Sequence, residues 1–413
     1  MAEIIVIGGG AAGMMAAYTA ASAGASVTLL ERNEKLGKKV YITGKGRCNV
    51  TNDCTRDEFL AQVPRNPRFL YSALAAFSPQ DMMALLEKAG CPVTVQRGRR
   101  VFPASEKASD VTRAFERLLR ESGVRVRLNT RVAEILTAEG RVTGVQCADG
   151  ARLPAEAVIL CTGGTSYPAT GSTGDGDRMA AALGHTVEPR HGVLVGLETA
   201  EDWPSRLQGL SLKNVTLTLK KGKKTLYSEL GELLFTHFGI SGPLVLEMSC
   251  HLPEPLADAR VSLNLKPGLT AEQLENRLQR DLDESPRKQL DHVLPQLLPA
   301  RLAELFPALC GLDGSRACKT INTQERRRLA EALQDLPLTV TAPRPVDEAI
   351  VTRGGVSVRE VGPGTMASKL IPGLYIAGEQ LDVDAHTGGY NLQIAWSTGR
   401  LAGQSAAEWV LNA

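Results

Sequence analysis

A Gly8-x-Gly10-x-x-Gly13 spacing near the N-terminus constrains the fold of this chain more than any other feature. The glycines follow a short β-type run, 3–7, and open an Ala-rich helical stretch, 11–23. This is the context in which the spacing binds a dinucleotide. The first glycine permits a tight turn, the second lets a pyrophosphate approach the backbone, and the third allows close packing of the helix. The helix N-terminus adds N–H groups and a positive dipole end for the phosphates.

A second apolar run, 26–30, ends at Glu31 and completes a strand, a helix and a strand. Units of this kind build buried parallel sheets. Glu31 is placed to accept hydrogen bonds from an adenosine ribose. A glycine-rich turn in another kind of α/β protein is the weaker interpretation, because all these features occur together. The pattern predicts a Rossmann-type domain for FAD or NAD.

Two later segments favour FAD. Residues 161–164, CTGG, follow a predicted buried strand and are similar to a segment of two-dinucleotide-binding-domain flavoproteins. Residues 373–379, GLYIAGE, and 387–391, TGGYN, resemble the C-terminal flavin segment of those proteins. There an acidic residue, here Glu379, bonds the ribityl chain, and the next helix N-terminus stabilises negative charge on the reduced flavin. No second Gly-x-Gly-x-x-Gly lies between a strand and a helix, so NAD(P)H is expected as a transient electron donor.

Four motifs extend the likeness over nearly the whole chain. They are GRCNVTN at 46–52, LFTHFGISGP at 234–243, TRGGVSV at 352–358 and GEQLDVDAHTGGYNLQIAWSTG at 378–399. Together they resemble the BaiN-like, or YhiN-like, NAD(P)/FAD-dependent oxidoreductases. The resemblance implies an α/β fold: a Rossmann-type FAD domain with a parallel sheet, interrupted by an inserted β-rich, barrel-like part and a helical part. It also implies reduction of carbon–carbon double bonds. One branch is associated with dihydrouridine in large-subunit ribosomal RNA, another with bile-acid metabolism, and some members carry an aminoacetone-oxidase label.

The predicted domains are a discontinuous FAD domain, 1–190 and 341–413, and an inserted substrate domain, 191–340, β-rich to about residue 265 and helical from about 266. Lys and Arg number 18 in the insertion and Asp and Glu 19, a net charge of −1, so it is not globally basic. Ser78 and Thr270 are expected to cap helices, and 55–123 is expected to be mainly helical. Strands are expected at 124–128, 131–136, 141–147, 158–161, 193–197, 215–219, 226–234, 261–265 and 374–377, and a helix from about residue 391.

The motifs and the resemblance predict the FAD contacts. The loop 43–49, TGKGRCN, is expected beside the isoalloxazine ring and the pyrophosphate, where Arg47 would offset phosphate charge or bond the ring. The predicted contacts are Gly8, Gly10, Ala11, Ala12, Gly13, Glu31, Arg32, Lys39, Thr43, Gly44, Gly46, Arg47, Cys48, Asn49, Val132, Thr162, Gly163, Gly164, Gly378, Glu379, Gly389, Tyr390 and Asn391.

Three residues are candidates for catalysis. In one interpretation the neighbouring Arg47 lowers the pKa of Cys48, which acts as a proton donor or nucleophile; we favour the other, in which the thiol fills space against the cofactor. His237, in the insertion, and His386, in the flavin segment, can donate a proton near neutral pH. A histidine bonded to backbone at a strand end is an equally good interpretation of His237.

Composition narrows the class of protein. The formal net charge of +2 provides no strong field toward nucleic acid or anionic membranes. The eight cysteines include no C-x-x-C pair and no metal-ligand spacing, so reduced thiols, no metal and a cytoplasmic location are expected. No run predicts a membrane span. The sequence carries no signal for an oligomeric state and is compatible with a monomer.

The expected reaction reduces a conjugated C=C bond with hydride from NAD(P)H, passed through FAD. Uridine in large-subunit ribosomal RNA is the preferred substrate, and a small enone such as a steroid is the alternative. An amine oxidase and a non-catalytic, FAD-containing RNA-binding factor are further possibilities. Basic runs at 97–100, 220–224 and 326–328 could contact RNA phosphates. A solvated surface or hairpin tip is the more common interpretation of each, and 220–224 has the pattern of a hairpin turn.

Overall fold

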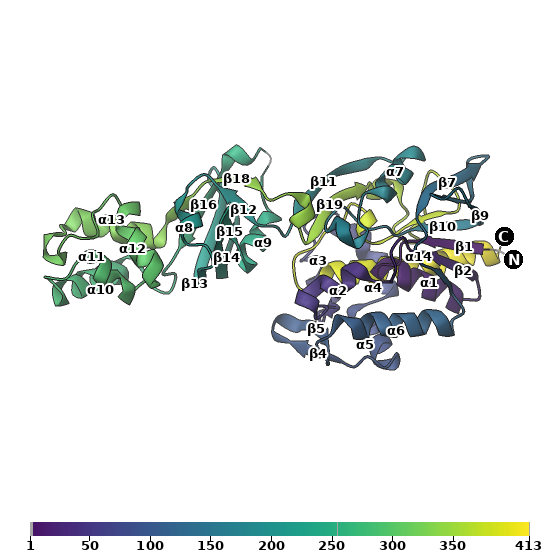
Figure 1. The fold of residues 1–413 in the computed structure, drawn as a ribbon, viewed down its shortest axis with the longest axis horizontal. Coiled ribbons are helices and arrows are strands. Elements are labelled where there is room, and N and C mark those ends of the chain that lie inside the picture. Colours follow the sequence, from purple (N-terminus) through teal and green to yellow (C-terminus); the bar gives the residue numbers. More distant parts are fainter. Residues whose placement is uncertain (1–2, 254, 413) are drawn as a thin grey trace. The chain divides into compact units, whose positions relative to one another are not determined.

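The computed structural model describes residues 3–253 and 255–412. It contains two compact units, coloured along the chain in Figure 1. Unit 1 comprises Met1–Val193 and Val346–Ala413, and unit 2 comprises Leu194–Pro345. The role of the insertion as a substrate domain stays a prediction.

A parallel five-stranded sheet forms the centre of unit 1, in the order β20-β10-β1-β2-β6. The chain runs outward from β1 to β2 and β6 and then returns to β10 on the other side of β1, so the winding direction reverses between β1 and β10. Ligands of open α/β sheets bind beyond the carboxyl ends of the strands at such a point. This confirms the predicted Rossmann-type sheet, whose strands are β1 (Glu3–Ile7), β2 (Ser26–Leu30), β6 (Arg125–Arg127), β10 (Ala157–Leu160) and β20 (Leu374–Ile376).

The first and last helices of unit 1, α1 (Ala11–Ser22) and α14 (Tyr390–Leu411), pack backbone against backbone. A Cβ atom on Gly399 would lie 2.4 Å from the carbonyl oxygen of Ala12, and one on Gly403 would lie 2.3 Å from that of Ala16. The equal spacing of these contacts shows that the two helices run in the same direction. Their N-termini therefore point to the same edge of the sheet, and α14 begins roughly 12 Å farther out along the helix axis.

Smaller elements surround this centre. The chain adds a two-stranded sheet, β11-β19, and two three-stranded sheets, β3-β5-β4 and β7-β8-β9. Their bounds are β3 (Thr51–Asn52), β4 (Val93–Gln96), β5 (Arg100–Pro103), β7 (Val132–Ala138), β8 (Arg141–Cys147), β9 (Arg152–Pro154), β11 (Val187–Val193) and β19 (Val351–Val356). The remaining helices of unit 1 are α2 (Lys38–Ile42), α3 (Arg56–Leu60), α4 (Tyr71–Ala76), α5 (Pro79–Lys88), α6 (Ala108–Glu121) and α7 (Asp175–Ala182).

Two of the predicted segments need correction. The prediction that 55–123 is mainly helical is wrong for β4 and β5, which form a hairpin around a turn with Gly98 at φ +75°. The predicted strand 193–197 is also wrong, because β11 ends at Val193 and β12 begins only at Leu197. Short strands next to a turn that requires positive φ leave too few residues for the period-2 pattern to be recognised.

Unit 2 contains a seven-stranded antiparallel sheet and a set of helices. The strand order is β17-β16-β13-β14-β15-β12-β18. The strands are β12 (Leu197–Thr199), β13 (Ser211–Lys221), β14 (Lys224–Thr236), β15 (Gly239–Ser241), β16 (Ala259–Asn264), β17 (Leu336–Leu338) and β18 (Val340–Pro343). The helices are α8 (Trp203–Arg206), α9 (Pro243–Ser249), α10 (Ala271–Glu284), α11 (Leu290–Val293), α12 (Ala300–Leu309) and α13 (Thr323–Gln334). These elements confirm a β-rich part followed by a helical part.

Within the described ranges, no helix is long and apolar enough to cross a membrane. All eight cysteines are free and buried. The expected caps are present, because the Ser78 hydroxyl accepts the N–H of Asp81 and the Thr270 hydroxyl accepts that of Gln273.

The contact between α1 and α14 makes a prediction about stability. Replacing Gly399 by Ala would place a methyl group against a backbone carbonyl that cannot rotate away, so we expect a loss of about 2–3 kcal/mol in the free energy of unfolding. Gly364→Ala is the matched control, since that exposed position has open space and no left-handed φ. It should be neutral or slightly stabilising. Denaturant unfolding of both variants checks this, and equal stability of the two would contradict the close contact.

Candidate functional site

Four predicted site segments meet at the carboxyl edge of the parallel sheet. Gly8 follows β1, Glu31 follows β2, residues 161–164 follow β10, and Gly378 follows β20. Since the four strands are parallel and adjacent in the order β20-β10-β1-β2, their ends lie side by side. This edge is the candidate site.

The turn between β1 and α1 is packed closely on one side and open on the other. A Cβ atom on Gly8 would lie 2.5 Å from the Cys161 carbonyl oxygen, and one on Gly13 would lie 1.8 Å from the Gly8 carbonyl oxygen. A Cβ atom on Gly10 would meet nothing within 4 Å. Gly8 and Gly13 are thus required for packing, whereas the open backbone at Gly10 is accessible to a ligand at the helix N-terminus.

Glu31 holds the turn in place and retains capacity for one more hydrogen bond. Its buried carboxylate accepts the N–H of Gly9 at 2.7 Å, the N–H of Asn33 at 2.8 Å and the side-chain amide of Asn33 at 2.7 Å. A carboxylate offers about four lone-pair positions, so one position remains for a donor such as a ribose hydroxyl.

Glu379 and Lys39 form a half-buried ion pair. The Lys39 ammonium lies 2.6 Å from one Glu379 oxygen and donates to Ser166 Oγ at 2.6 Å. The other Glu379 oxygen accepts the N–H of Thr352 at 2.8 Å. Burial alone would raise the pKa of Glu379, but the Lys39 charge and these hydrogen bonds outweigh it, and the pKa lies below its ordinary value. Glu379 therefore stays ionised at neutral pH.

The sequence patterns singled out Lys39 and Glu379 separately but did not predict their contact, or the parts played by Ser166 and Thr352. The Thr352 hydroxyl accepts the N–H groups of Thr165 and Ser166 at 3.0 and 3.1 Å. In the sequence, the TRGGVSV motif that begins at residue 352 was the one feature that could have indicated the role of Thr352. It marks the strand β19, whose first residues support the carboxylate.

A series of side-chain hydrogen bonds that begins at Thr162 positions the segment after β10. The Thr162 hydroxyl donates to the Gln380 side-chain oxygen at 2.7 Å, and the Gln380 amide donates to Asp177 at 2.6 Å. Arg190 also pairs with Asp177, at 2.6 Å, and donates to the Glu379 carbonyl oxygen at 3.0 Å. The sequence patterns did not predict Gln380, Asp177 or Arg190 as parts of the site.

Arg32, a predicted contact, is held by Asp175 at the start of α7. Its guanidinium lies 3.2 Å from the carboxylate, Arg131 lies 2.8 Å from it, and Arg178 also pairs with it. Burial raises the pKa of Asp175, but the hydrogen bonds and charges of Arg131 and Arg178 outweigh it and lower the pKa to about 2. Arg131 precedes Val132, so this cluster also fixes the start of β7, where the predicted contact Val132 is buried.

The loop 43–49 is a tight turn with an unusual number of left-handed residues. Gly44, Lys45, Gly46 and Cys48 have φ values of +57°, +58°, +85° and +61°. Non-glycine residues adopt this conformation rarely, and strain of this kind is concentrated at functional sites. The Thr43 hydroxyl donates to the Val40 carbonyl oxygen at 2.7 Å and joins the loop to α2.

Arg47 and Cys48 point in different directions. The Arg47 guanidinium lies 3.1 Å from Glu106 and 4.4 Å above the Phe102 ring, whereas the Cys48 side chain is fully buried. Burial raises the pKa of Cys48 to about 12. The interpretation in which Arg47 lowers the pKa of Cys48 is therefore wrong, because the charge points away and the thiol is removed from water.

The N-terminus of α14 is clamped to the segment after this loop. A Cβ atom on Gly389 would lie 2.3 Å from the Thr51 carbonyl oxygen. With its amide oxygen oriented toward Gly389, Asn49 accepts that residue's N–H at 3.0 Å and donates to the Thr51 carbonyl oxygen at 3.2 Å. The Asn391 side chain bonds both the N–H and the carbonyl of Ala385. Tyr390 packs edge-on against Phe59, with 5.2 Å between ring centroids.

The two histidine candidates lie in different units. His386 is half-buried in the segment that leads to α14, and its backbone N–H donates to the Gln62 carbonyl oxygen at 3.0 Å. His237 is exposed at the turn between β14 and β15, edge-on to Phe238 at 5.1 Å. Both stay predictions.

The edge fits the flavin adenine dinucleotide that the sequence predicts. The open backbone at Gly10 offers N–H donors for a pyrophosphate, and the N-terminus of α14 lies farther out, where a flavin ring would follow. The Glu31 carboxylate can accept a ribose hydroxyl. Each predicted FAD contact stays a prediction. Over residues 3–253 and 255–412, no group of three or more His, Cys, Asp or Glu could hold a metal ion.

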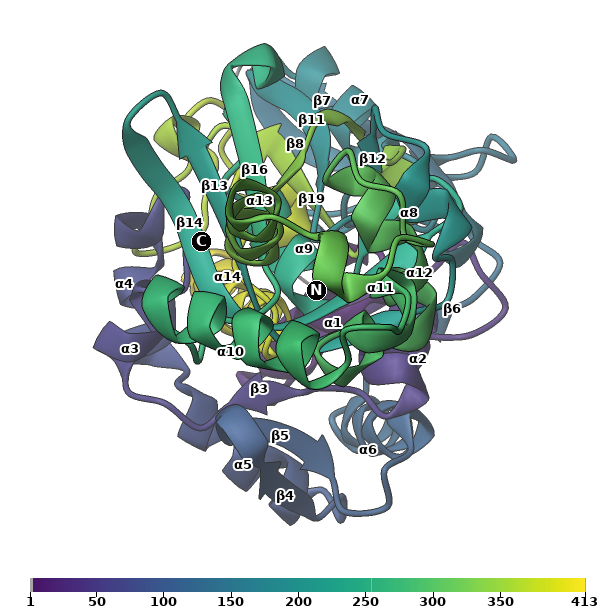
Figure 2. The same cartoon turned by 90° about the vertical axis from the view of Figure 1, so that its left-hand side faces the viewer.

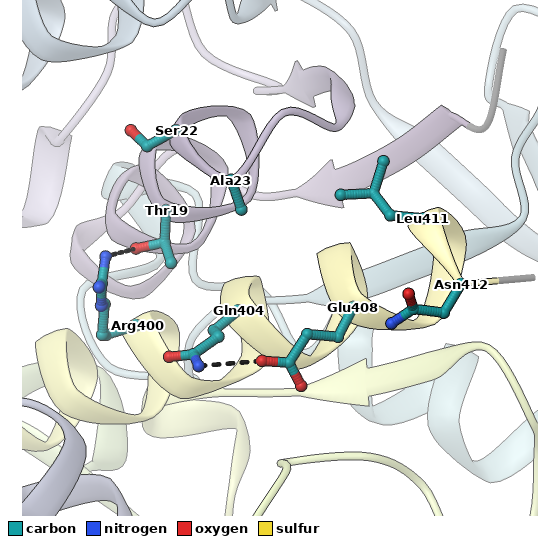
Figure 3. A pocket seen from close by; sticks show the side chains of 8 residues that line it. All are labelled: Thr19, Ser22, Ala23, Arg400, Gln404, Glu408, Leu411 and Asn412. Carbon is teal, nitrogen blue, oxygen red and sulfur yellow. Dashed lines mark hydrogen bonds between the residues drawn. The ribbon is translucent and has the colours of Figure 1, made fainter.

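A hollow at the other end of the same helix pair does not belong to this site. Figure 3 shows it between the C-terminal parts of α1 and α14. Two polar pairs cross or line it: Arg400 donates to Thr19 Oγ1 at 3.3 Å, and Gln404 donates to Glu408 at 3.0 Å.

The sequence profile described as "HI0933-like protein Rossmann domain" matches residues 2–405. The chain belongs to the HI0933-like family. This is a flavoprotein-type family, which confirms the resemblance that the four motifs indicate, and the chain is an FAD-dependent oxidoreductase.

Two relatives of this HI0933-like chain match over nearly their full length. A 3-dehydro-bile acid delta(4,6)-reductase of Clostridium scindens is 33% identical over 414 residues, 99% of this chain and 100% of the relative. A ribosomal RNA dihydrouridine synthase of Escherichia coli is 32% identical over 397 residues, 96% of each chain. Among solved structures, the Mycobacterium smegmatis Sdh1 complex in the apo form has a TM-score of 0.54 at 19% identity, covering all of this chain and 69% of that one. The last similarity shows a shared fold.

The burial of Cys48 makes a prediction about its role. Because the thiol is protonated and removed from water, we expect Cys48→Ala to retain bound flavin and to change turnover less than about threefold. The absorbance spectrum and steady-state turnover of the variant check this. A loss of more than about a hundredfold in turnover with flavin retained would instead assign the thiol to the reaction.

Proposed function

We propose that this flavoprotein uses NAD(P)H to reduce a conjugated C=C bond and that its preferred substrate is uridine in large-subunit ribosomal RNA. The observation that carries the proposal is the arrangement of cations next to the flavin segment. Lys45 lies on the loop whose Asn49 contacts Gly389, and Arg97 and Arg100 lie on the β4–β5 hairpin that Asn52 links to Gly388; all three side chains are exposed. A polyanionic substrate can contact several such cations at once, whereas a small enone with a single carboxylate can contact only one.

A small enone is the second candidate function. It is favoured by the 33% identity to the bile-acid reductase over that relative's whole length. Both candidate functions reduce a conjugated C=C bond. They differ in the rest of the substrate, which is an RNA chain in one case and a small molecule in the other.

The residues of the site have separable tasks in this proposal. When bound, FAD supplies the hydride chemistry. The N–H groups at the start of α1 would hold the pyrophosphate, and Glu31 the adenosine ribose. Lys39 keeps Glu379 ionised, so that this carboxylate can only accept hydrogen bonds, as a ribityl hydroxyl requires. The N-terminus of α14, fixed by Asn49 and Asn391, would favour negative charge that develops nearby during reduction.

The substrate is tested by the dihydrouridine content of ribosomal RNA. Deleting the gene should remove dihydrouridine from the large-subunit RNA, and the wild-type gene on a plasmid should restore it, as measured by mass spectrometry of nucleosides. Purified protein with FAD and NADPH or NADH should form the same product on RNA from the deletion strain. Unchanged content in the deletion strain would rule out the RNA substrate.

Different results would support the remaining candidate functions. Turnover of a bile-acid-type enone without any effect on RNA would support the small-enone reductase. Rapid, stoichiometric peroxide formation with an amine and no nicotinamide would support an oxidase. A flavin that neither nicotinamide reduces would support a non-catalytic RNA-binding factor.

We propose His386 as the proton donor, because it precedes the α14 N-terminus within the unit that carries the FAD edge. His386→Gln should retain flavin and its reduction by NAD(P)H but slow reduction of the substrate by about 10²–10⁴-fold. Single-turnover kinetics of each half-reaction measure this. His237→Gln is the matched control, and a selective loss in that variant instead would transfer the role to unit 2.

A further inference from the structure

The β4–β5 hairpin projects a basic turn from unit 1. Arg97 and Arg99 lie in its turn and Arg100 begins β5, and all three are exposed. Figure 2 shows the hairpin together with α5 at one edge of the unit. The basic run is visible in the sequence, but a solvated surface was the favoured interpretation there, since the β4–β5 hairpin itself was not predicted.

The side chain of Asn52 links this turn to the flavin segment. The side-chain amide of Asn52 donates to the Gly98 carbonyl oxygen and to the Gly388 carbonyl oxygen, both at 3.0 Å. The N–H of the next residue, Asp53, donates to the Arg99 carbonyl oxygen in the same turn at 2.8 Å. One asparagine thus joins the tip of the hairpin to the turn that precedes α14.

Nearby acidic residues form ion pairs with some of the arginines in and around the hairpin, but not with all of them. Arg99 lies 2.7 Å from Glu58, and Arg47 lies 3.1 Å from Glu106. Among the residues that the structure describes, no ion pair joins Arg97 or Arg100 to an acid. Exposed, uncompensated guanidinium groups are suited to bidentate contact with phosphate.

We infer that Arg97 and Arg100 bind the phosphate backbone of the RNA substrate and so bring its target base to the flavin edge beside Gly388. The inference rests on the proposed RNA substrate and adds the residues that recognise it. Phosphate contacts set the register of a strand without reading its sequence. The fixed link through Asn52 would give the bound strand a defined position relative to α14.

The test uses the double variant Arg97→Gln/Arg100→Gln in the full-length, flavin-loaded protein. The matched control is Lys223→Gln/Lys224→Gln, which removes two exposed cations from the β13–β14 turn of unit 2. Filter binding measures the affinity of each protein for deproteinised ribosomal RNA from the deletion strain as a function of salt. Reduction of the flavin by NAD(P)H without RNA measures whether the core reaction is intact.

We expect the arginine variant to bind RNA about tenfold more weakly and to lose about 1.4 from the slope of log affinity against log salt, roughly 0.7 for each single-stranded phosphate contact. Its flavin reduction should equal that of the wild type, and the lysine variant should match the wild type in every respect. Equal RNA affinity and slope in the arginine variant would overturn the inference, even if the wild type forms dihydrouridine. Absence of RNA binding by the wild type would also overturn it.

Failure of the proposed function gives a different result. If the wild type binds RNA through these arginines but forms no dihydrouridine, the phosphate contact stands and the RNA-reductase proposal fails. If the wild type forms dihydrouridine and the arginine variant forms it equally well at low RNA concentration, the proposed function stands and the phosphate contact fails.

Discussion

The rest of the site depends on the close parallel contact between α1 and α14. Gly399 and Gly403 admit the backbone of Ala12 and Ala16 at a distance where a methyl group would clash. This contact joins the first and last helices of the chain, which are separated by all of unit 2 in sequence. Because both helices run in the same direction, it brings two helix N-termini to one edge of the sheet. A long ligand with an anionic centre and a distant polar ring can meet both.

Paired charges neutralise the carboxylates at this edge and leave the helix termini for the ligand. Glu379 is neutralised by Lys39, Asp175 by three arginines, and Asp177 by Arg190. Half-buried carboxylates without such partners would be costly to ionise and would repel pyrophosphate. Among the residues that the structure describes, Arg97 and Arg100 on the hairpin and Lys45 on the loop 43–49 have no acid partner and are exposed to solvent or a polyanion.

The sequence predicted the features that depend on residues close together in the chain or at the ends of neighbouring strands. The glycine turn, Glu31 and the capping residues Ser78 and Thr270 act on groups within a few residues or at the next strand end. The contact between Lys39 and Glu379 spans 340 positions and depends on how the sheet brings its ends together. For Cys48 the sequence left two interpretations open, and the full burial of the thiol in a left-handed turn agrees with the favoured one, in which it fills space.

The central claim is that the carboxyl edge of this sheet holds a flavin that passes hydride from a nicotinamide to a C=C bond in RNA. Anaerobic titration of the purified protein, followed by its flavin absorbance, tests this most directly. Reduction by NADPH or NADH should bleach the flavin band, and ribosomal RNA from the deletion strain, unlike RNA from the wild type, should restore it with one dihydrouridine formed per flavin reoxidised. A flavin that is reduced but not reoxidised by the unmodified RNA would contradict the account.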